Sequence, residues 1–180
     1  MTGVQTCALP IGLLHIALAK LAGATTILAA GREGRLAAAT DFGATCAFAL
    51  TGEALTAEVR ERTNGRGADV VIVAVGDLAL ANQALELAAI GGRVNYFAGF
   101  PKGRTASIDP NLIHYRELAV TGGSNARRAD VRRAVELLSS GALDVGRLVT
   151  HRFPLAELDA AVTAVARRDG LKVAVMPAAG

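Results

Sequence analysis

A glycine at the start of a candidate helix could help to bind a phosphate group. Gly12 opens an almost wholly apolar segment, 12–21, which is typical of a helix packed against a sheet. In the pattern G-x-G-x-x-G between a strand and a helix, glycines let a pyrophosphate approach the helix N-terminus closely. If Gly12 is the third glycine, the first two should stand at positions occupied by Cys7 and Leu9. Gly12 therefore predicts a phosphate-binding turn, and its other interpretation is a packing glycine at a strand–helix junction.

Two arginines follow the next apolar run. In dinucleotide-binding folds that prefer NAD, an Asp or Glu about 20 residues after the glycine turn binds the adenosine ribose. Counting back from Phe42-Gly43-Ala44, that position is Ala30, and Arg32 lies two residues later. Arg32 and Arg35 could hold a 2′-phosphate through charge-assisted hydrogen bonds. We therefore predict that NADP(H) is preferred, with NAD possible; alternatively both arginines begin a solvated helix.

Glycines also end two later apolar runs. Val75 and Gly76 end one candidate strand, and Phe97, Ala98 and Gly99 end the next. Ligands of open α/β sheets bind at the carboxyl ends of the strands, where the strand order reverses. Each glycine could simply terminate its strand, but together with Gly12 they favour one binding edge.

Candidate strands and helices alternate through most of the chain. The patterns predict strands at 24–30, 45–49, 68–75, 93–97 and 118–121, and helices at 12–21, 33–41, 53–63, 78–89 and 111–115. This alternation predicts an α/β fold with a doubly wound parallel sheet and right-handed crossovers. After Gly122 and Gly123 the composition changes, and helices at 130–140 and 155–168 with strands at 149–153 and 171–176 form a carboxyl-terminal extension.

The first eleven residues differ in character from the rest of the chain. Residues 1–11 resemble the translation of a sequencing adaptor, and they lack the charged start and sustained apolar core of a signal peptide. We expect 1–11 to be a non-native leader, 12–122 the dinucleotide-binding domain and 123–180 a separate carboxyl-terminal segment. The alternative is that residues 4–9 are a genuine strand.

Composition excludes several classes of protein. The chain has 180 residues, of which 52% are hydrophobic, and its formal charge of +3 comes from scattered basic residues. No apolar run approaches the roughly 20 residues of a membrane span. Two cysteines exclude a disulfide framework and a zinc site of four thiolates. We expect a cytoplasmic protein that binds neither nucleic acid nor membrane.

Several blocks together resemble the zinc-dependent medium-chain dehydrogenases of the alcohol, sorbitol and threonine dehydrogenase type. The blocks are PIGLLHIALAKLAGA, GRGADVVIVAVG, GGRVNYFAGFPKG, IDPNLIHYRELAVTGG, VTHRFPLAELDAAVTAV and LKVAVMP. The resemblance implies a Rossmann sheet in the strand order 3-2-1-4-5-6. It also implies hydride transfer between NAD(P) and an alcohol, with zinc polarising the substrate oxygen. The block from Asn95 to Gly123 is most similar to the sorbitol and polyol-phosphate branch, which implies a polyol or sugar alcohol as substrate.

The resemblance also implies cofactor-binding roles for residues that match the family's motifs. Gly12 would lie under the pyrophosphate, Arg32 by the adenosine ribose, Val75 and Gly76 near the adenine, Phe97, Ala98 and Gly99 along the nicotinamide with Gly122 and Gly123 close by, and Lys172 against the pyrophosphate. Lys172 could equally be an exposed strand end.

The departures from the family concern the metal. The family's zinc ligands lie in an amino-terminal catalytic domain before the glycine turn, and we expect that domain to be missing here. We assign no catalytic or metal-binding residue: Cys46 reads as a buried thiol, His15 as helix packing, His114 as a loop contact and His151 as a strand end. The resemblance then implies a truncated, inactive chain whose parent binds zinc.

Other expectations come from the same resemblance. Segment 123–180 would return to the absent domain, which leaves the apolar faces of 131–138 and 158–165 open. The full-length parent would be a homo-oligomer joined around residues 104–108. Two alternatives stay open, a zinc-independent quinone or enoyl reductase of the same superfamily and a non-enzymatic nucleotide-binding module.

Overall fold

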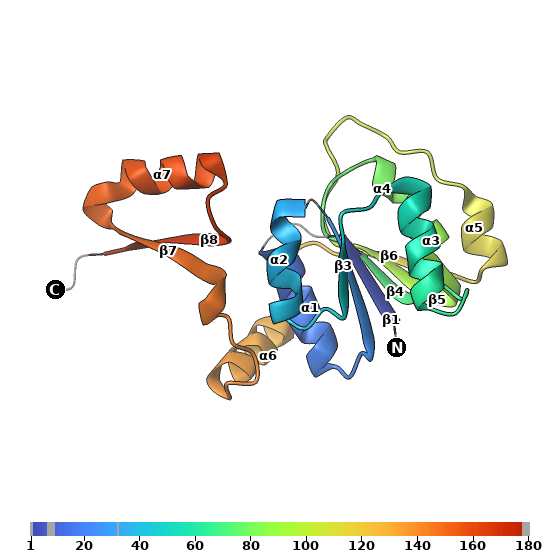
Figure 1. The fold of residues 1–180 in the computed structure, drawn as a ribbon, viewed down its shortest axis with the longest axis horizontal. Coiled ribbons are helices and arrows are strands. Elements are labelled where there is room, and N and C mark those ends of the chain that lie inside the picture. The colour runs from blue at the N-terminus through green and yellow to red at the C-terminus, as the bar shows by residue number, and fades with distance from the viewer. Residues whose placement is uncertain (1, 7–9, 32, 178–180) are drawn as a thin grey trace. The chain divides into compact units, whose positions relative to one another are not determined.

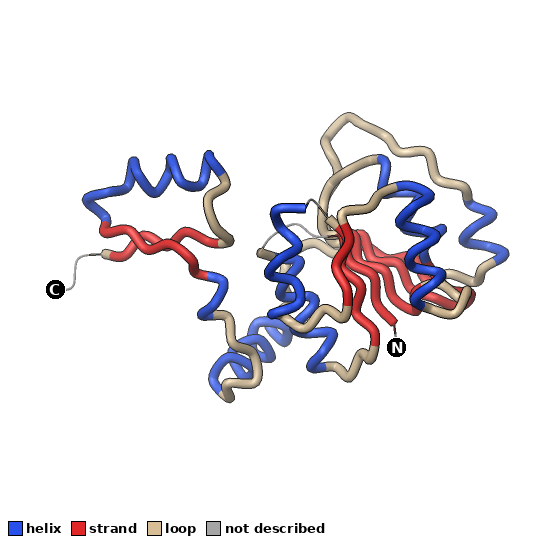
Figure 2. The backbone as a smooth tube through the Cα atoms, viewed as in Figure 1, coloured by secondary structure: helices blue, strands red, loops and turns tan. Residues whose placement is uncertain are grey.

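Two compact units make up the computed structural model, which describes residues 2–6, 10–31 and 33–177. The first unit runs to Arg127 and the second begins at Arg128. A sheet of six strands lies in the first unit and a sheet of two strands lies in the second (Figure 1). Figure 2 shows the six strands stacked side by side, with helices along them.

The six-stranded sheet has the order β3-β2-β1-β4-β5-β6, and every neighbouring pair is parallel. The strands are β1 (Thr2–Thr6), β2 (Thr26–Ala30), β3 (Cys46–Phe48), β4 (Ala68–Val73), β5 (Ala88–Tyr96) and β6 (Ala119–Gly122). The predicted fold class and strand order are therefore confirmed. The residues expected to be a leader supply β1, which pairs with β2 and β4 in the middle of the sheet. The alternative strand at 4–9 is thus shifted toward the N-terminus, and Cys7, Ala8 and Leu9 lie outside the described residues.

Helices cover both faces of this sheet. They are α1 (Ile11–Leu21), α2 (Glu33–Asp41), α3 (Gly52–Arg62), α4 (Ala79–Leu87) and the short α5 (Pro110–Tyr115). Helix α1 contacts α2 on one face, and α3 contacts α4 on the other (Figure 1). Strands enclosed in this way need apolar side chains on both sides, and β2 is buried from Ile27 to Ala30.

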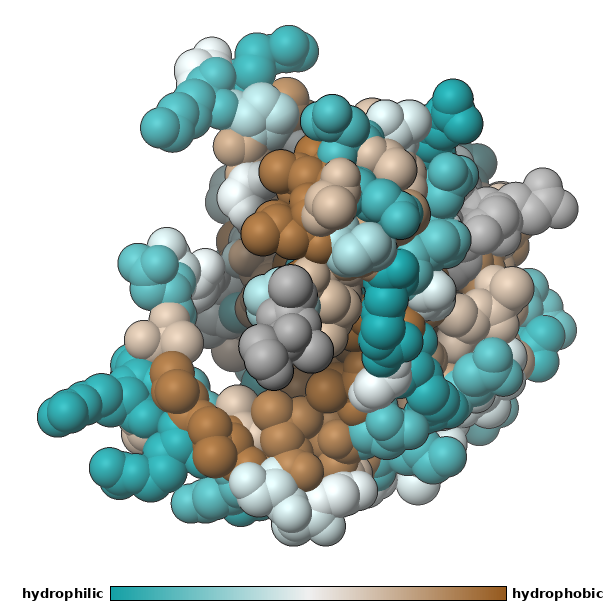
Figure 3. Space-filling model, turned by 90° about the vertical axis from the view of Figure 1, so that its left-hand side faces the viewer, coloured by the Kyte–Doolittle hydropathy of each residue, from teal (hydrophilic) through white to brown (hydrophobic). Residues whose placement is uncertain are grey.

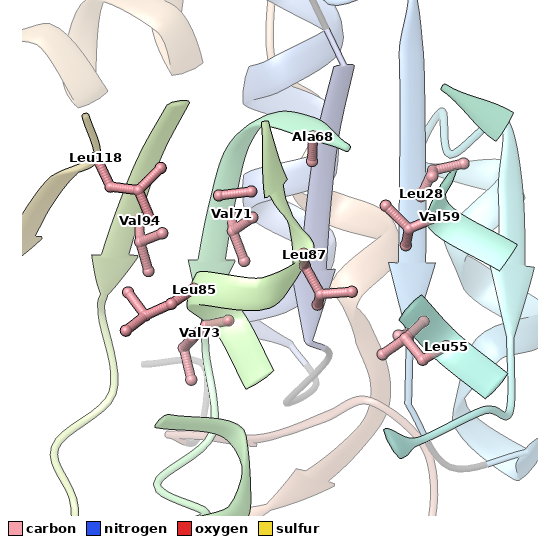
Figure 4. Packing of buried hydrophobic residues seen from close by; sticks show 13 residues of the cluster. Leu28, Leu55, Val59, Ala68, Val71, Val73, Leu85, Leu87, Val94 and Leu118 are labelled. Carbon is pink, nitrogen blue, oxygen red and sulfur yellow. The ribbon is translucent and has the colours of Figure 1, made fainter. Parts of the chain in front are cut away.

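A buried hydrophobic cluster lies between the sheet and the α3–α4 layer. Leu55 and Val59 of α3 and Leu85 and Leu87 of α4 meet the strand residues in Figure 4. The buried members of the cluster are Leu28, Ala30, Leu55, Val59, Ala68, Val71, Val73, Ala84, Leu85, Leu87, Ala88, Val94 and Leu118. All of these buried members are aliphatic, and their close packing joins the sheet to the α3–α4 layer.

Strand β5 begins earlier than the sequence predicts. The turn expected at Ile90-Gly91-Gly92 lies inside β5, which starts at Ala88 directly after α4. Ala88 pairs with Ala68, and the register then jumps so that Val70 pairs with Arg93. Gly91 has a φ of 71°, so the chain makes its expected turn as an irregularity within the strand.

The second unit is a helix followed by a small β-α-β motif. It contains α6 (Arg128–Ser139), β7 (Val149–Pro154), α7 (Leu158–Arg167) and β8 (Lys172–Met176), with single helical turns η1 (Gly146–Leu148) and η2 (Leu155–Glu157). Strands β7 and β8 are parallel. The apolar side chains expected to be open are exposed, among them Val131 and Val135 of α6 and Val162 and Val165 of α7. Figure 3, coloured by hydropathy, shows hydrophobic residues on the surface that faces the viewer.

Among the described residues, the helices are too short or too polar for any of them to cross a membrane.

Candidate functional site

The carboxyl ends of the six strands lie in one row, which we call the carboxyl edge. Strand pairing aligns the last residue of each strand with that of its neighbour, in the order Phe48, Ala30, Thr6, Val73, Tyr96 and Gly122. Residues that directly follow these positions must therefore lie along the carboxyl edge. Gly31, Ala74, Phe97 and Gly123 are in this position, so segments far apart in sequence come together there.

The loops after β4 and β5 are bound tightly to each other. The backbone N–H groups of Phe97 and Ala98 both donate to the carbonyl of Val73, at 3.1 and 2.9 Å. A Cβ on Gly76 would overlap the carbonyl oxygen of Gly99 and would lie 3.4 Å from the Cα of Phe100. Gly76 thus lets the two loops touch, and the predicted residues 75–76 and 97–99 form one continuous wall.

Helix α1 starts close to the carboxyl edge because it follows the central strand β1. Gly12 is buried in its first turn, and Pro10, at the N-cap, provides no side-chain hydrogen bond to that turn. No acidic residue lies in the first turn. The unpaired N–H groups and the dipole of such a helix start favour a negatively charged group.

The two predicted arginines cannot be described in the same detail. Arg32 lies outside the described residues, directly after Gly31, whose N–H donates to the carbonyl of Phe48 at 3.1 Å. Arg35 lies in the first turn of α2. Their contact with a 2′-phosphate stays a prediction.

Helix α4 is fixed behind this wall by polar contacts at both ends. The carboxylate of Asp77 accepts a hydrogen bond from the N–H of Ala79 at 3.0 Å, where the chain turns from β4 into α4. Tyr96 donates its hydroxyl hydrogen to the carbonyl of Ala81, and burial raises the pKa of this phenol. At the other end, Nη1 of Arg116 donates to three carbonyls, those of Leu85, Glu86 and Ala88, at 3.1, 3.0 and 3.1 Å.

An aromatic contact joins α1 to the loop after β5. The rings of His15 and Phe97 meet edge to face, with centroids 4.5 Å apart and an interplanar angle of 81°. Nδ1 of His15 lies 3.0 Å from the carbonyl of Ile11, to which it can donate. Burial lowers the pKa of His15 below 6.5 and outweighs the opposing effect of this hydrogen bond. Sequence reasoning predicts only helix packing for His15, and no local pattern indicates a partner 82 residues away.

A family model described as zinc-binding dehydrogenase matches residues 10–140 of the chain. The chain belongs to this family. The match covers the helix start at Gly12, both loops of the wall and β6.

Relatives are similar to this chain over nearly all of its length. An L-threonine 3-dehydrogenase from Bacillus licheniformis is 33% identical over 170 residues, which is 93% of this chain and 49% of the relative. An alcohol dehydrogenase from Thermus sp. ATN1 superimposes with a TM-score of 0.89 at 30% identity, over 98% of this chain and 51% of the other. A zinc-binding dehydrogenase from Sinorhizobium meliloti 1021, solved bound to NADP, gives a TM-score of 0.87 at 32% identity, over 98% and 52%. The chain therefore spans about half the length of the relatives it matches.

The described residues of the chain do not form a zinc site of their own. Within residues 2–6, 10–31 and 33–177, no three His, Cys, Asp or Glu side chains are grouped so that they could hold a metal ion. Cys46 is a free, half-buried thiol in β3. His15, His114 and His151 lie in α1, α5 and β7. We therefore derive no chemical step through zinc from these residues.

The three remaining predicted residues are Gly122 and Gly123 in the first unit and Lys172 in the second. Gly122 ends β6 and Gly123 follows it, so both belong to the carboxyl edge. Lys172 begins β8 in the second unit and is exposed. Its pairing with a pyrophosphate stays a prediction.

Proposed function

We propose that this chain is the coenzyme-binding part of a longer alcohol oxidoreductase. The preferred coenzyme is NADP(H), and NAD is a weaker ligand. The coenzyme is the acceptor or donor of the hydride. The residues that hold it are those of the carboxyl edge and of the start of α1. The substrate is a small alcohol, most specifically a polyol or sugar alcohol.

The observation that carries this proposal is the alignment of the carboxyl ends of β1, β2, β4 and β5. The strand order reverses between β1 and β4, which is where open α/β sheets bind their ligands. In this arrangement the first turn of α1 receives the pyrophosphate at Gly12. Phe97, Ala98 and Gly99 lie along the nicotinamide, and the Val73 carbonyl fixes the backbone of Phe97 and Ala98.

The preference for NADP(H) rests on charge at the end of β2. The residues at this end, Ala30 and Gly31, provide no carboxylate to bind a 2′-hydroxyl or to repel a 2′-phosphate. Arg32 and Arg35 supply positive charge instead, and a planar guanidinium suits a phosphate. The NADP bound to a 32% identical relative is in keeping with this assignment.

The remaining parts of the enzyme belong to the longer protein in this proposal. Zinc would polarise the substrate oxygen there, and residues 123–180 would pack against the domain that holds it, covering the exposed apolar faces of α6 and α7. Lys172 would then reach the pyrophosphate. By itself the chain would bind coenzyme without turning over alcohol, in the cytoplasm, and the longer protein would be a homo-oligomer joined around residues 104–108.

Binding of the two reduced coenzymes tests the proposal. The chain has no Trp, so the fluorescence of the nicotinamide itself can be followed as NADPH or NADH is titrated into the protein. We expect saturable binding of both, with NADPH bound more tightly. Losing Arg35 through Arg35→Ala should weaken NADPH by roughly tenfold, the value of one charged hydrogen bond, and leave NADH unchanged. Arg66→Ala, an exposed charge before the start of β4, is the matched control. If neither NADPH nor NADH saturates the chain, the proposal is overturned.

A further inference from the structure

A histidine that the proposed function does not use lies beside the proposed nicotinamide site. His15 is the fifth residue of α1, and side chains on a helix lean toward its N-terminus. Its ring therefore extends toward the start of α1, where Nδ1 reaches the Ile11 carbonyl at 3.0 Å. At this place it meets Phe97, which directly follows β5 on the carboxyl edge.

The backbone of Phe97 is held by a hydrogen bond, and one side of its ring packs against His15. The N–H group of Phe97 donates to the Val73 carbonyl at 3.1 Å, so the Cα position is set by β4. The side chain is 43% exposed, which is unusual for a phenylalanine beside the core. The edge-to-face contact with His15, at 4.5 Å between centroids, supports the ring on one side, and its exposed part can meet a ligand.

We propose that His15 is a positioning residue that holds the Phe97 ring ready to contact the nicotinamide half of the coenzyme. This inference rests on the proposed function, because it requires a coenzyme at the carboxyl edge. The contact joins the helix that follows β1 to the loop that follows β5, so it spans the point where the strand order reverses. Ordering of the ring before binding removes part of the entropy that binding would otherwise cost.

The charge state of His15 is compatible with this role. Burial lowers its pKa below 6.5, so the imidazole is neutral at pH 7.5 and does not repel the positive ring of an oxidised nicotinamide. A neutral imidazole with Nδ1–H donated to Ile11 also keeps a fixed ring plane. The aromatic partner is therefore held in place by α1 itself.

The test compares a ligand that contains nicotinamide with one that lacks it. Calorimetry at pH 7.5 would give the dissociation constants of NADPH and of 2′-phospho-ADP-ribose for the unmodified chain, His15→Leu and His15→Phe. Leu keeps apolar volume and helix propensity but removes the ring, whereas Phe restores an edge-to-face partner. We expect His15→Leu to weaken NADPH by roughly two- to tenfold, with the 2′-phospho-ADP-ribose constant unchanged. His15→Phe should recover most of the loss.

Three outcomes would overturn the inference. These are an unchanged NADPH constant in His15→Leu, equal weakening of both ligands, or a His15→Phe variant as weak as His15→Leu. A second variant, Phe97→Leu, should show the same selective loss, and adding His15→Leu to it should have no further effect. If His15→Leu fails to fold, Phe97→Leu and His15→Phe decide the question. If neither ligand binds the unmodified chain, the proposed function itself fails and this inference fails with it.

Discussion

Substitution of Gly76 by alanine is the most direct perturbation of the wall on the carboxyl edge. The added Cβ would overlap the carbonyl oxygen of Gly99 and would lie 3.2 Å from its carbonyl carbon and 3.4 Å from the Cα of Phe100. All three are backbone atoms, which cannot rotate away as the end of a side chain can. The loop after β5 must therefore move as a whole, and with it the residues assigned to the nicotinamide.

The size of the effect depends on the two contributions that the substitution changes. Overpacking against rigid neighbours costs about 1–3 kcal/mol of unfolding free energy. Replacing glycine by alanine recovers about 0.4–1 kcal/mol, because the unfolded chain loses freedom. Neither Gly76 nor Gly99 has a φ in the left-handed region, so backbone strain does not add to this difference. We expect Gly76→Ala to destabilise the protein by about 1–2 kcal/mol and to weaken NADPH by roughly tenfold, which corresponds to ~1.4 kcal/mol.

Gly99→Ala is the matched control for Gly76→Ala. A Cβ on Gly99 meets no atom within 4 Å, although the residue lies in the same contact. Urea denaturation and an NADPH titration should be measured for both variants and for the unmodified chain. We expect Gly99→Ala to be at least as stable as the unmodified chain. Gly99→Ala is a control for stability alone, because Gly99 itself is assigned to the nicotinamide. Equal losses of unfolding free energy in the two variants would refute the close approach between the two loops.

Three further predictions concern side chains that are not part of the wall itself. Arg116→Gln removes a charged donor to three carbonyls at the end of α4 and should lower the unfolding free energy by about 1–3 kcal/mol in urea denaturation. Thr63→Val removes the buried hydroxyl that accepts a hydrogen bond from Gly67 N–H at 2.9 Å, and should lower the unfolding free energy by about 1–3 kcal/mol in the same measurement. Its control is Thr40→Val at an exposed position, which should change the unfolding free energy by less than about 0.5 kcal/mol. Burial lowers the pKa of His15 in the folded state below 6.5, so the unfolded chain takes up the His15 proton first and the unfolding free energy should fall as the pH drops below 6.5. When unfolding is compared at pH 7.5 and 5.5, this fall should be smaller in His15→Phe.

The sheet could be predicted because its signals are local. The apolar run at 68–75 and the helix at 33–41 are each complete within a few residues, and the structure places β4 and α2 there. Alternation of such segments predicts a doubly wound parallel sheet with right-handed crossovers, whereas the strand order follows from the family resemblance. The start of β5 could not be predicted, because Gly91 and Gly92 carry a turn signal that the structure accommodates inside a strand.

The candidate site was predictable only in part for a related reason. Glycines at the ends of strands mark an edge, so Gly76 and Gly99 could be found from the sequence. Their mutual contact could not, because it depends on the separation of two loops in space. The contact of His15 with Phe97 is of the same kind: a residue pattern assigns each to its own element, and only the packing of α1 beside β5 brings them together.

The central claim is that a dinucleotide binds along the carboxyl edge, and amide chemical shifts test it most directly. NADPH would be titrated into ¹⁵N-labelled chain while the amide signals of both ends of the sheet are followed. We predict saturable shifts at Gly31, Phe97 and Ala98, with signals at the opposite ends of the strands, such as Thr26 and Ala119, unchanged. Shifts confined to the opposite ends, or no saturable shifts at all, would contradict the claim.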